Sequence, residues 1–287
     1  MSADEQNPEP HNPLGIDGIE FIEYATSQPQ AFGALLQKLG FVPVARHRSR
    51  EVMLYRQGGM NLIVNSAVPS GETPVLGAIA LRVRDAGNAW RHAIDSGAWE
   101  IETHASAMEL NIPGIHGAGD SVIYFVDRHR EFSIYDVDFV KLPDAPAKVP
   151  AVAGLHWFGV VQSVQEDRSA DWIDFYHHLL GFSVLPEGKY FGVLPKGTLL
   201  QSPCGKFYLQ LIEPPAGAQD IHWDEGLARV GLGAPDVPAA VKKLQERGVV
   251  FIDHGAVQPS SKGALTQIYL GGVTFELVVS HLKVSQP

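Results

Sequence analysis

The spacing of hydrophobic and polar residues along the chain changes several times, and the changes recur. Residues 16–25 alternate apolar and polar side chains, which predicts a strand. Residues 29–39 have apolar side chains at helical spacing, and three short apolar runs follow before Asn65, with Gly58 and Gly59 marking a hairpin turn. The pattern therefore predicts a unit of one strand, one helix and three strands.

The same unit is predicted three more times. In the second unit we expect a helix over 86–96 and strands over 99–103, 122–127 and 133–140. In the third and fourth we expect helices over 170–180 and 237–247, with last strands over 207–213 and 274–279. A Leu-Gly-Phe sequence ends the first helix of each half, at 39–41 and 180–182. These shared signatures indicate a duplicated chain, and they disfavour the alternative of two unrelated α+β domains.

One such unit cannot fold alone, because its sheet has open edges and one apolar face. Two units must pair into a curved sheet around a cavity. The predicted fold class is therefore α+β, with four βαβββ modules paired into two half-barrel domains. We expect the domains to span residues 15–142 and 152–280, joined by a Pro- and Ala-rich linker over 143–151. Residues 1–14 and 281–287 are expected to form disordered tails.

Composition and charge narrow the class of protein. Hydrophobic residues make up 45% of the 287-residue chain, as in a globular protein, and no apolar run has the roughly 18 residues needed to span a membrane. The net charge of -10, without a Lys/Arg cluster, argues against nucleic-acid binding. Cys204, the single cysteine, excludes an internal disulfide and suits a reducing cytoplasm. We expect a cytoplasmic protein without membrane or nucleic-acid partners, whose exposed sheet edges would allow a homodimer.

The N-terminal half also resembles a known family over most of residues 15–141. The matching segments cover residues 18–23, 45–49, 54–58, 61–65, 108–113 and 133–140. They resemble the vicinal-oxygen-chelate superfamily of paired βαβββ modules (the glyoxalase/bleomycin resistance/dioxygenase type), and within it the 4-hydroxyphenylpyruvate dioxygenase family. The C-terminal half matches more weakly and is shorter than in that family.

The resemblance implies a division of roles between the halves. In the family the N-terminal half is structural, and the C-terminal half holds Fe(II) on two histidines and one glutamate, where a 2-oxo acid is oxidised. The first histidine position, at the start of the third unit, matches His156. The glutamate position, on the last strand of the fourth unit, matches Glu276. The resemblance therefore makes His156 and Glu276 the candidate metal ligands and catalytic residues.

The second histidine position is the main departure from the family, because Arg229 occupies it. A guanidinium stays protonated and has no lone pair for a metal. Three alternatives remain open. His222, a few residues upstream, could supply the missing ligand; Arg229 could turn outward while another cation binds to oxygen ligands; or a register change could make Arg229 a surface residue.

Two glutamines complete the candidate site as substrate contacts. Gln210 lies on the strand over 206–213, where Ile212 aligns with a substrate-facing asparagine of the family, and Gln267 aligns with a pocket-facing glutamine. The leading hypothesis is a metal-dependent enzyme, an Fe(II)-type oxidoreductase, acting on a small aromatic or cyclic (oxo)carboxylate. The alternative is a catalytically degenerate, metal-free binding or accessory module in which Arg229 binds a carboxylate; without iron, His156 could still act as a base toward a bound oxo acid.

Overall fold

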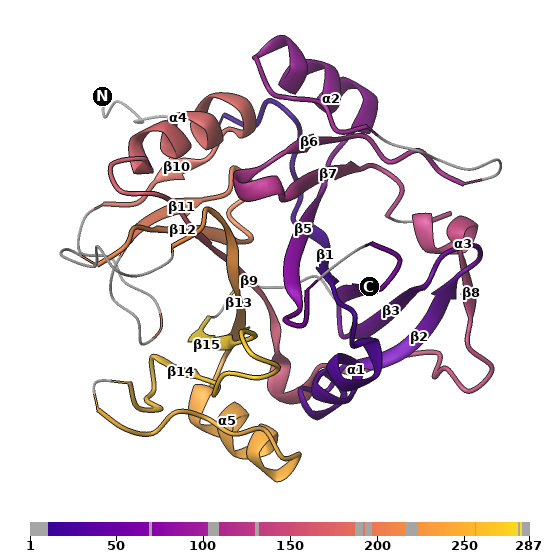
Figure 1. The fold of residues 1–287 in the computed structure, drawn as a ribbon, viewed down its shortest axis with the longest axis vertical. Coiled ribbons are helices and arrows are strands. Elements are labelled where there is room, and N and C mark those ends of the chain that lie inside the picture. Colours follow the sequence, from indigo (N-terminus) through magenta and orange to yellow (C-terminus); the bar gives the residue numbers. More distant parts are fainter. Residues whose placement is uncertain are drawn as a thin grey trace, which may run out of the picture.

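A computed structural model describes residues 11–68, 71–102, 109–129, 132–186, 192, 197–215, 223–255, 257–280 and 282. Within them the strands form two mixed sheets, one from each half of the chain (Figure 1). The first sheet has the order β6-β7-β5-β1-β4-β3-β2-β8 and the second the order β10-β11-β12-β9-β13-β15-β14. This confirms the predicted α+β class with the two modules of each half joined in one sheet.

The strands of the first sheet are β1 (Ile19–Ala25), β2 (Val42–His47), β3 (Val52–Gln57), β4 (Met60–Asn65), β5 (Val75–Arg82), β6 (Gly114–His116), β7 (Val122–Val126) and β8 (Phe139–Lys141). Those of the second are β9 (His156–Ser163), β10 (Ser183–Val184), β11 (Thr198–Gln201), β12 (Tyr208–Ile212), β13 (Gly226–Ala234), β14 (Gly263–Leu265) and β15 (Phe275–Val279). The helices are α1 (Pro29–Lys38), α2 (Ala86–Asp95), α3 (Ile134–Asp138), α4 (Ser169–Leu180) and α5 (Val237–Glu246), with short 3-10 turns η1 (Ala118–Asp120) and η2 (Val152–Gly154).

Helix boundaries follow local chemistry that both halves share. The second helix of each half starts at an aspartate whose carboxylate accepts a backbone N–H, Asp85 from Asn88 at 2.8 Å and Asp236 from Ala239 at 2.9 Å. Helix α4 ends at Gly181, whose φ of 75° lies in the left-handed region that glycine tolerates best. No helix of the described residues is long and apolar enough to cross a membrane.

Two segments differ from the sequence-based expectation. The predicted strand over 133–140 begins instead as helix α3, because Ser133 and Asp136 form a capping box that starts a helical turn. Only its end is a strand, β8, which pairs with β2 and extends the edge of the first module. The strand predicted over 99–103 is reduced to a single bridge between Glu100 and Ile115, and residue 103 lies outside the described residues.

Residues 11–14, which we expected to belong to a disordered tail, are described by the structure. Residues 1–10 lie outside the described residues, but Leu14 is buried in the core. The side chain of Asn12 holds the backbone of Ile16, donating to its carbonyl at 2.9 Å and accepting its N–H at 2.8 Å. Residues 11–14 are therefore part of the folded protein. Of the expected C-terminal tail, only Leu282 is described.

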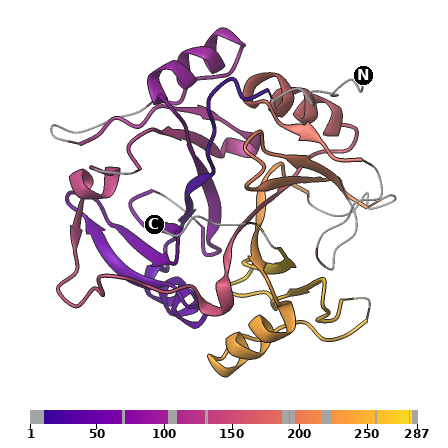
Figure 2. The ribbon, with the colours of Figure 1, turned by 180° about the vertical axis from the view of Figure 1, so that it is seen from behind.

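One hydrophobic core joins the two halves. Rings from the two sheets meet in it, with Tyr24 and Phe275 at 6.3 Å and Phe41 and Trp157 at 6.1 Å between centroids. Figures 1 and 2 show α2 beside α4 at one end of the molecule and α1 beside α5 at the other. Each sheet thus turns one face to the shared core, and the opposite face is left to form a separate cavity in each half.

Candidate functional site

Three neighbouring strands bring the candidate residues of the C-terminal half together. Strand β13 runs antiparallel to β9 and parallel to β15. Arg229 on β13 is paired with Val161 on β9, and Gly231, two residues further on, is paired with Glu276 on β15. Because directly paired residues and residues two apart share a face of a sheet, Val161, Arg229 and Glu276 face the same side.

Arg229 and Glu276 form a buried ion pair. Nε of Arg229 lies 3.3 Å from Oε2 of Glu276, and their side chains are only 13% and 4% exposed. This nitrogen is buried, yet its N–H is not directed at any acceptor among the described residues. The contact is therefore electrostatic rather than a directed hydrogen bond. Arg229 and Glu276 are therefore direct neighbours on adjacent strands.

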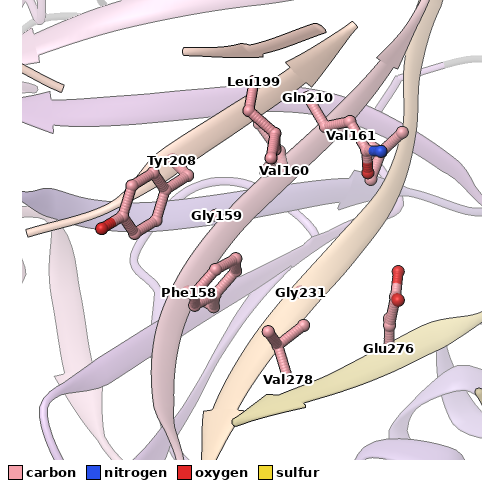
Figure 3. A pocket seen from close by; sticks show the side chains of 10 residues that line it. All are labelled: Phe158, Gly159, Val160, Val161, Leu199, Tyr208, Gln210, Gly231, Glu276 and Val278. Carbon is pink, nitrogen blue, oxygen red and sulfur yellow. The ribbon is translucent and has the colours of Figure 1, made fainter. Parts of the chain in front are cut away.

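The pocket beside this pair is small. Its cavity measures about 20 Å³, which is room for about one water molecule. Figure 3 shows the carboxylate of Glu276 pointing from β15 toward Val161 and Gln210. Phe158 and Tyr208 stack at 5.0 Å between centroids and form the apolar wall. The site therefore combines one ion pair, one amide and an aromatic wall.

His156 lies elsewhere, and both of its ring nitrogens are engaged. Nδ1 is 3.0 Å from the carbonyl oxygen of Gly154, which can only accept, so Nδ1 carries the proton. In the neutral ring, Nε2 then accepts from the hydroxyl of Ser280 at 2.8 Å. Burial lowers the pKa of His156, with the Gly154 hydrogen bond acting in the opposite direction, so the neutral ring is favoured. No lone pair is left for a metal.

The structure does not bring His156 to Glu276. His156 is paired with Gly233, whereas Glu276 lies one strand beyond Gly231. Two strand spacings and two residue rises separate the α-carbons, which amounts to about 12 Å. The ring instead lies across Gly233, where an added Cβ would come within 2.3 Å of Nε2. His156 therefore links β9, β13 and the end of β15, and a role as metal ligand beside Glu276 would require these contacts to break.

Sequence reasoning missed Val161 because the resemblance matched His156, at the start of the strand, to the first histidine position. The pairing of β9 with β13 instead places Val161 opposite Arg229 and skips Phe158. Strand β1 has the same irregularity, because its pairing with β5 skips Glu20. The residue that faces Arg229 is therefore identified by the strand pairing and not by the motif.

Of the three remaining candidates, only one lines the pocket in the described part of the chain. Gln210 lines the pocket, as proposed from the sequence. Gln267 does not: it is exposed beyond β14, and its backbone N–H donates to the carbonyl of Val250. The chain after Leu265 turns away from the pocket to bridge Phe251, which explains this error. His222 lies outside the described residues.

The residues at the three facing positions do not fit Fe(II). They offer an isopropyl group, a guanidinium and one carboxylate, and only the carboxylate can donate to a metal. The positive charge of Arg229 already neutralises that carboxylate at 3.3 Å. Over the whole described part of the chain, no three His, Cys, Asp or Glu side chains are grouped so as to hold a metal ion.

Comparisons with known proteins agree on one family. Residues 10–140 match the family model for the N-terminal part of hydroxyphenylpyruvate dioxygenase, and residues 155–261 match the glyoxalase/bleomycin resistance protein/dioxygenase superfamily. The chain is 34% identical to hemolysin VllY of Vibrio vulnificus, covering 84% of this chain and 73% of that protein. It is 32% identical to 4-hydroxyphenylpyruvate dioxygenase of Pseudomonas aeruginosa, covering 85% and 73%.

A solved structure shares the overall architecture. The fold matches a variant of 4-hydroxymandelate synthase from Streptomyces coelicolor with a TM-score of 0.73, over 96% of this chain and 95% of that one. Their sequences are 16% identical, so this likeness concerns the fold alone.

Proposed function

Because the chain belongs to the 4-hydroxyphenylpyruvate dioxygenase-like branch of the glyoxalase/bleomycin resistance/dioxygenase superfamily, we propose that it is a member that works without iron, as a binding or accessory module for a small carboxylate. The Arg229–Glu276 ion pair carries this proposal. It occupies the face of three adjacent strands on which the resemblance led us to expect metal ligands. A fixed cation supports recognition of an anion there instead of coordination of a metal.

The surroundings of Arg229 support a ligand with an aromatic or cyclic body. Its Nε–H has no hydrogen-bond acceptor among the described residues, which leaves this donor for the carboxylate of a ligand. Gln210 adds a donor and an acceptor, and the Phe158–Tyr208 stack offers an apolar surface. Since the present cavity of about 20 Å³ holds little more than water, a ligand must displace side chains. We therefore expect modest affinity, with a Kd of about 10 µM to 1 mM.

The metal-dependent enzyme remains the competing proposal, and it depends on His222. That residue would have to join Glu276 on the pocket face, and Arg229 would have to leave it. An iron site of this kind would contain His222, whereas the site proposed here would not use it.

Anaerobic calorimetry with Fe(II) separates the two proposals. We expect the wild-type protein to show no site tighter than about 10 µM. The double variant Val161→His/Arg229→His should gain one, because it places two imidazoles beside Glu276 on adjacent strands. Adding Glu276→Gln should weaken that new site by roughly tenfold or more. Tight Fe(II) binding by the wild type that is lost in His222→Ala would overturn the proposal.

The same protein samples test whether Arg229 binds a carboxylate. Benzoate and phenylpyruvate should bind to the wild type, benzyl alcohol should bind at least about tenfold more weakly, and Arg229→Met should lose the difference. Equal binding of the acid and the alcohol, or acid binding that survives Arg229→Met, would remove Arg229 from the site.

A further inference from the structure

The N-terminal half presents its own set of side chains at the positions that form the candidate site in the other half. Glu23 on β1 is paired with Ala78 on β5, as Val161 is paired with Arg229. Ala78 and Arg229 also stand at the same place along the chain, since each precedes the aspartate that caps the next helix by seven residues. The strand pairings therefore identify Glu23 with Val161 and Ala78 with Arg229.

The third position follows in the same way. Tyr124 on β7 is paired with Ala80, two residues beyond Ala78, as Glu276 is paired with Gly231. The N-terminal counterpart of the candidate site is thus a carboxyl, a methyl and a phenol group. Where the C-terminal half has the long side chain of Arg229, the N-terminal half has only the methyl group of Ala78, and Glu23 and Tyr124 both line a cavity.

The cavity of the N-terminal half is much larger than that of the C-terminal half. It measures about 210 Å³, compared with about 20 Å³ in the C-terminal half. A protein cavity of roughly 150 Å³ suffices to bind benzene, so this one can hold a ligand with one ring and a polar group. Its apolar wall consists of Phe21, Val52, Ile63, Ile101, Leu110, Ile112, Ile134 and Phe139.

Acidic side chains outnumber basic ones around the cavity. Glu23, Glu102, Glu109 and Asp138 line it, against Arg50 and His47. Arg50 is already paired with Glu109, its Nη2 lying 2.5 Å from Oε2, so this pair contributes little net charge. Burial lowers the pKa of His47, with Glu109 and Asp138 opposing that shift, which favours the neutral ring. The lining of the cavity therefore contains more acidic than basic side chains.

Glu23 lies at the centre of this arrangement. The amide nitrogen of Asn65 donates to its Oε1 at 2.9 Å and holds the carboxyl in place. Burial raises the pKa of Glu23, while Asn65 and Arg50 lower it, so a cation beside this carboxyl would stabilise its charged form. Burial, and with it the nearby Glu23, raises the pKa of the Tyr124 phenol. The ring of Tyr124 packs near Phe21, at 5.9 Å between centroids.

From this geometry we infer that the cavity of the N-terminal half binds a small organic cation, a primary amine carried on an aromatic or aliphatic body, with its ammonium group held between Glu23 and Tyr124. The ammonium group would pair with the buried carboxylate of Glu23, and the ring faces of Phe21 and Tyr124 would stabilise the cation further. The apolar wall takes the body of the ligand. This site uses none of the residues assigned to the carboxylate site in the C-terminal half.

Calorimetry with three probes of similar shape tests the site: benzylamine, benzyl alcohol and benzoate, added to the full-length protein. We expect benzylamine to bind with a Kd below about 1 mM and the alcohol at least roughly tenfold more weakly. In Glu23→Gln, which keeps an oxygen for Asn65, benzylamine affinity should fall by roughly tenfold or more. The matched control is Glu246→Gln, the same change on the exposed face of α5.

The outcomes are separable. Loss of benzylamine binding in Glu23→Gln but not in Glu246→Gln, with both variants unfolding near the wild-type temperature, supports the inference. If Glu23→Gln unfolds early, Tyr124→Phe provides a second test, because it removes only a hydroxyl and should weaken the amine more than the alcohol. Equal binding of amine and alcohol, unchanged affinity in both site variants, or no amine binding at about 10 mM overturns the inference.

Discussion

The Arg229–Glu276 pair makes a prediction about stability that can be worked out from the structure. At 3.3 Å and an effective dielectric constant of about 20, two unit charges attract by about 5 kcal/mol. Removing the two groups from water offsets much of this gain, and the contact lacks a directed hydrogen bond. We therefore expect a coupling free energy of about 2 kcal/mol between the two side chains.

A double-mutant cycle measures this coupling. Arg229→Met, Glu276→Gln and their combination are unfolded in urea at pH 7, and the free energies of unfolding are compared. Either single change should cost about 2–4 kcal/mol, because it leaves one charge buried without its partner. The double variant should be less destabilised than the sum of the single variants, since it buries no charge at this position.

The chain supplies its own control. Arg168 and Asp171 form a shorter contact, 2.8 Å, but their side chains are 48% and 67% exposed. We expect their coupling to stay below about 0.5 kcal/mol, because water screens exposed pairs. If the Arg229–Glu276 coupling were no larger than that of this control, the two side chains would not form the buried pair, and the argument against a metal at this face would lose its basis.

Two further predictions concern His156 and Gln57. The folded protein favours neutral His156, so the contribution of this residue to stability is present above the unfolded pKa of about 6.5 and is lost as the pH falls. His156→Gln should therefore lose less free energy of unfolding than the wild type between pH 7.5 and pH 5, as measured by urea titrations. Equal losses in the two proteins would contradict this prediction. Gln57 is fully buried and links the halves: its side chain donates to the carbonyl of Leu39 and accepts from the N–H of Val152, both at 2.9 Å. Gln57→Leu should lower the free energy of unfolding by about 2–4 kcal/mol. A loss under about 0.5 kcal/mol would show that this link does not stabilise the protein.

Much of the architecture was accessible from the sequence, because local patterns fix it. The helical spacing after Pro29 and in the segments 86–96 and 237–247 predicted helices that the structure contains with nearly the same bounds. Alternating residues predicted the strands that pair into each sheet. The error at 133–140 arose because a capping box overrides an apolar run over only a few residues.

The candidate site was only partly accessible, because it depends on strand register. Arg229 and Glu276 lie on adjacent strands whose pairing is regular from Val230 onward, and they form the ion pair described above. The pairing of β13 with β9 is irregular at Ala228 and at Phe158, so counting residues along a strand does not give the residue that faces Arg229. Neither periodicity nor similarity of a short motif reports such irregularities. The identity of the third facing residue, Val161, therefore required the three-dimensional pairing.

The two halves share one fold but differ in the residue at an equivalent position on a central strand of each sheet. Arg229 faces Glu276 from the middle of the second sheet, and the cavity beside the pair is small. Ala78 has the same position in the first sheet, where a larger cavity is lined by Glu23 and Tyr124. Under the two proposals made above, a cation at this position favours an anionic ligand, and its absence favours a cationic one. If both proposals hold, the charge of the central residue, and not the fold that the halves share, distinguishes the ligands of the two halves.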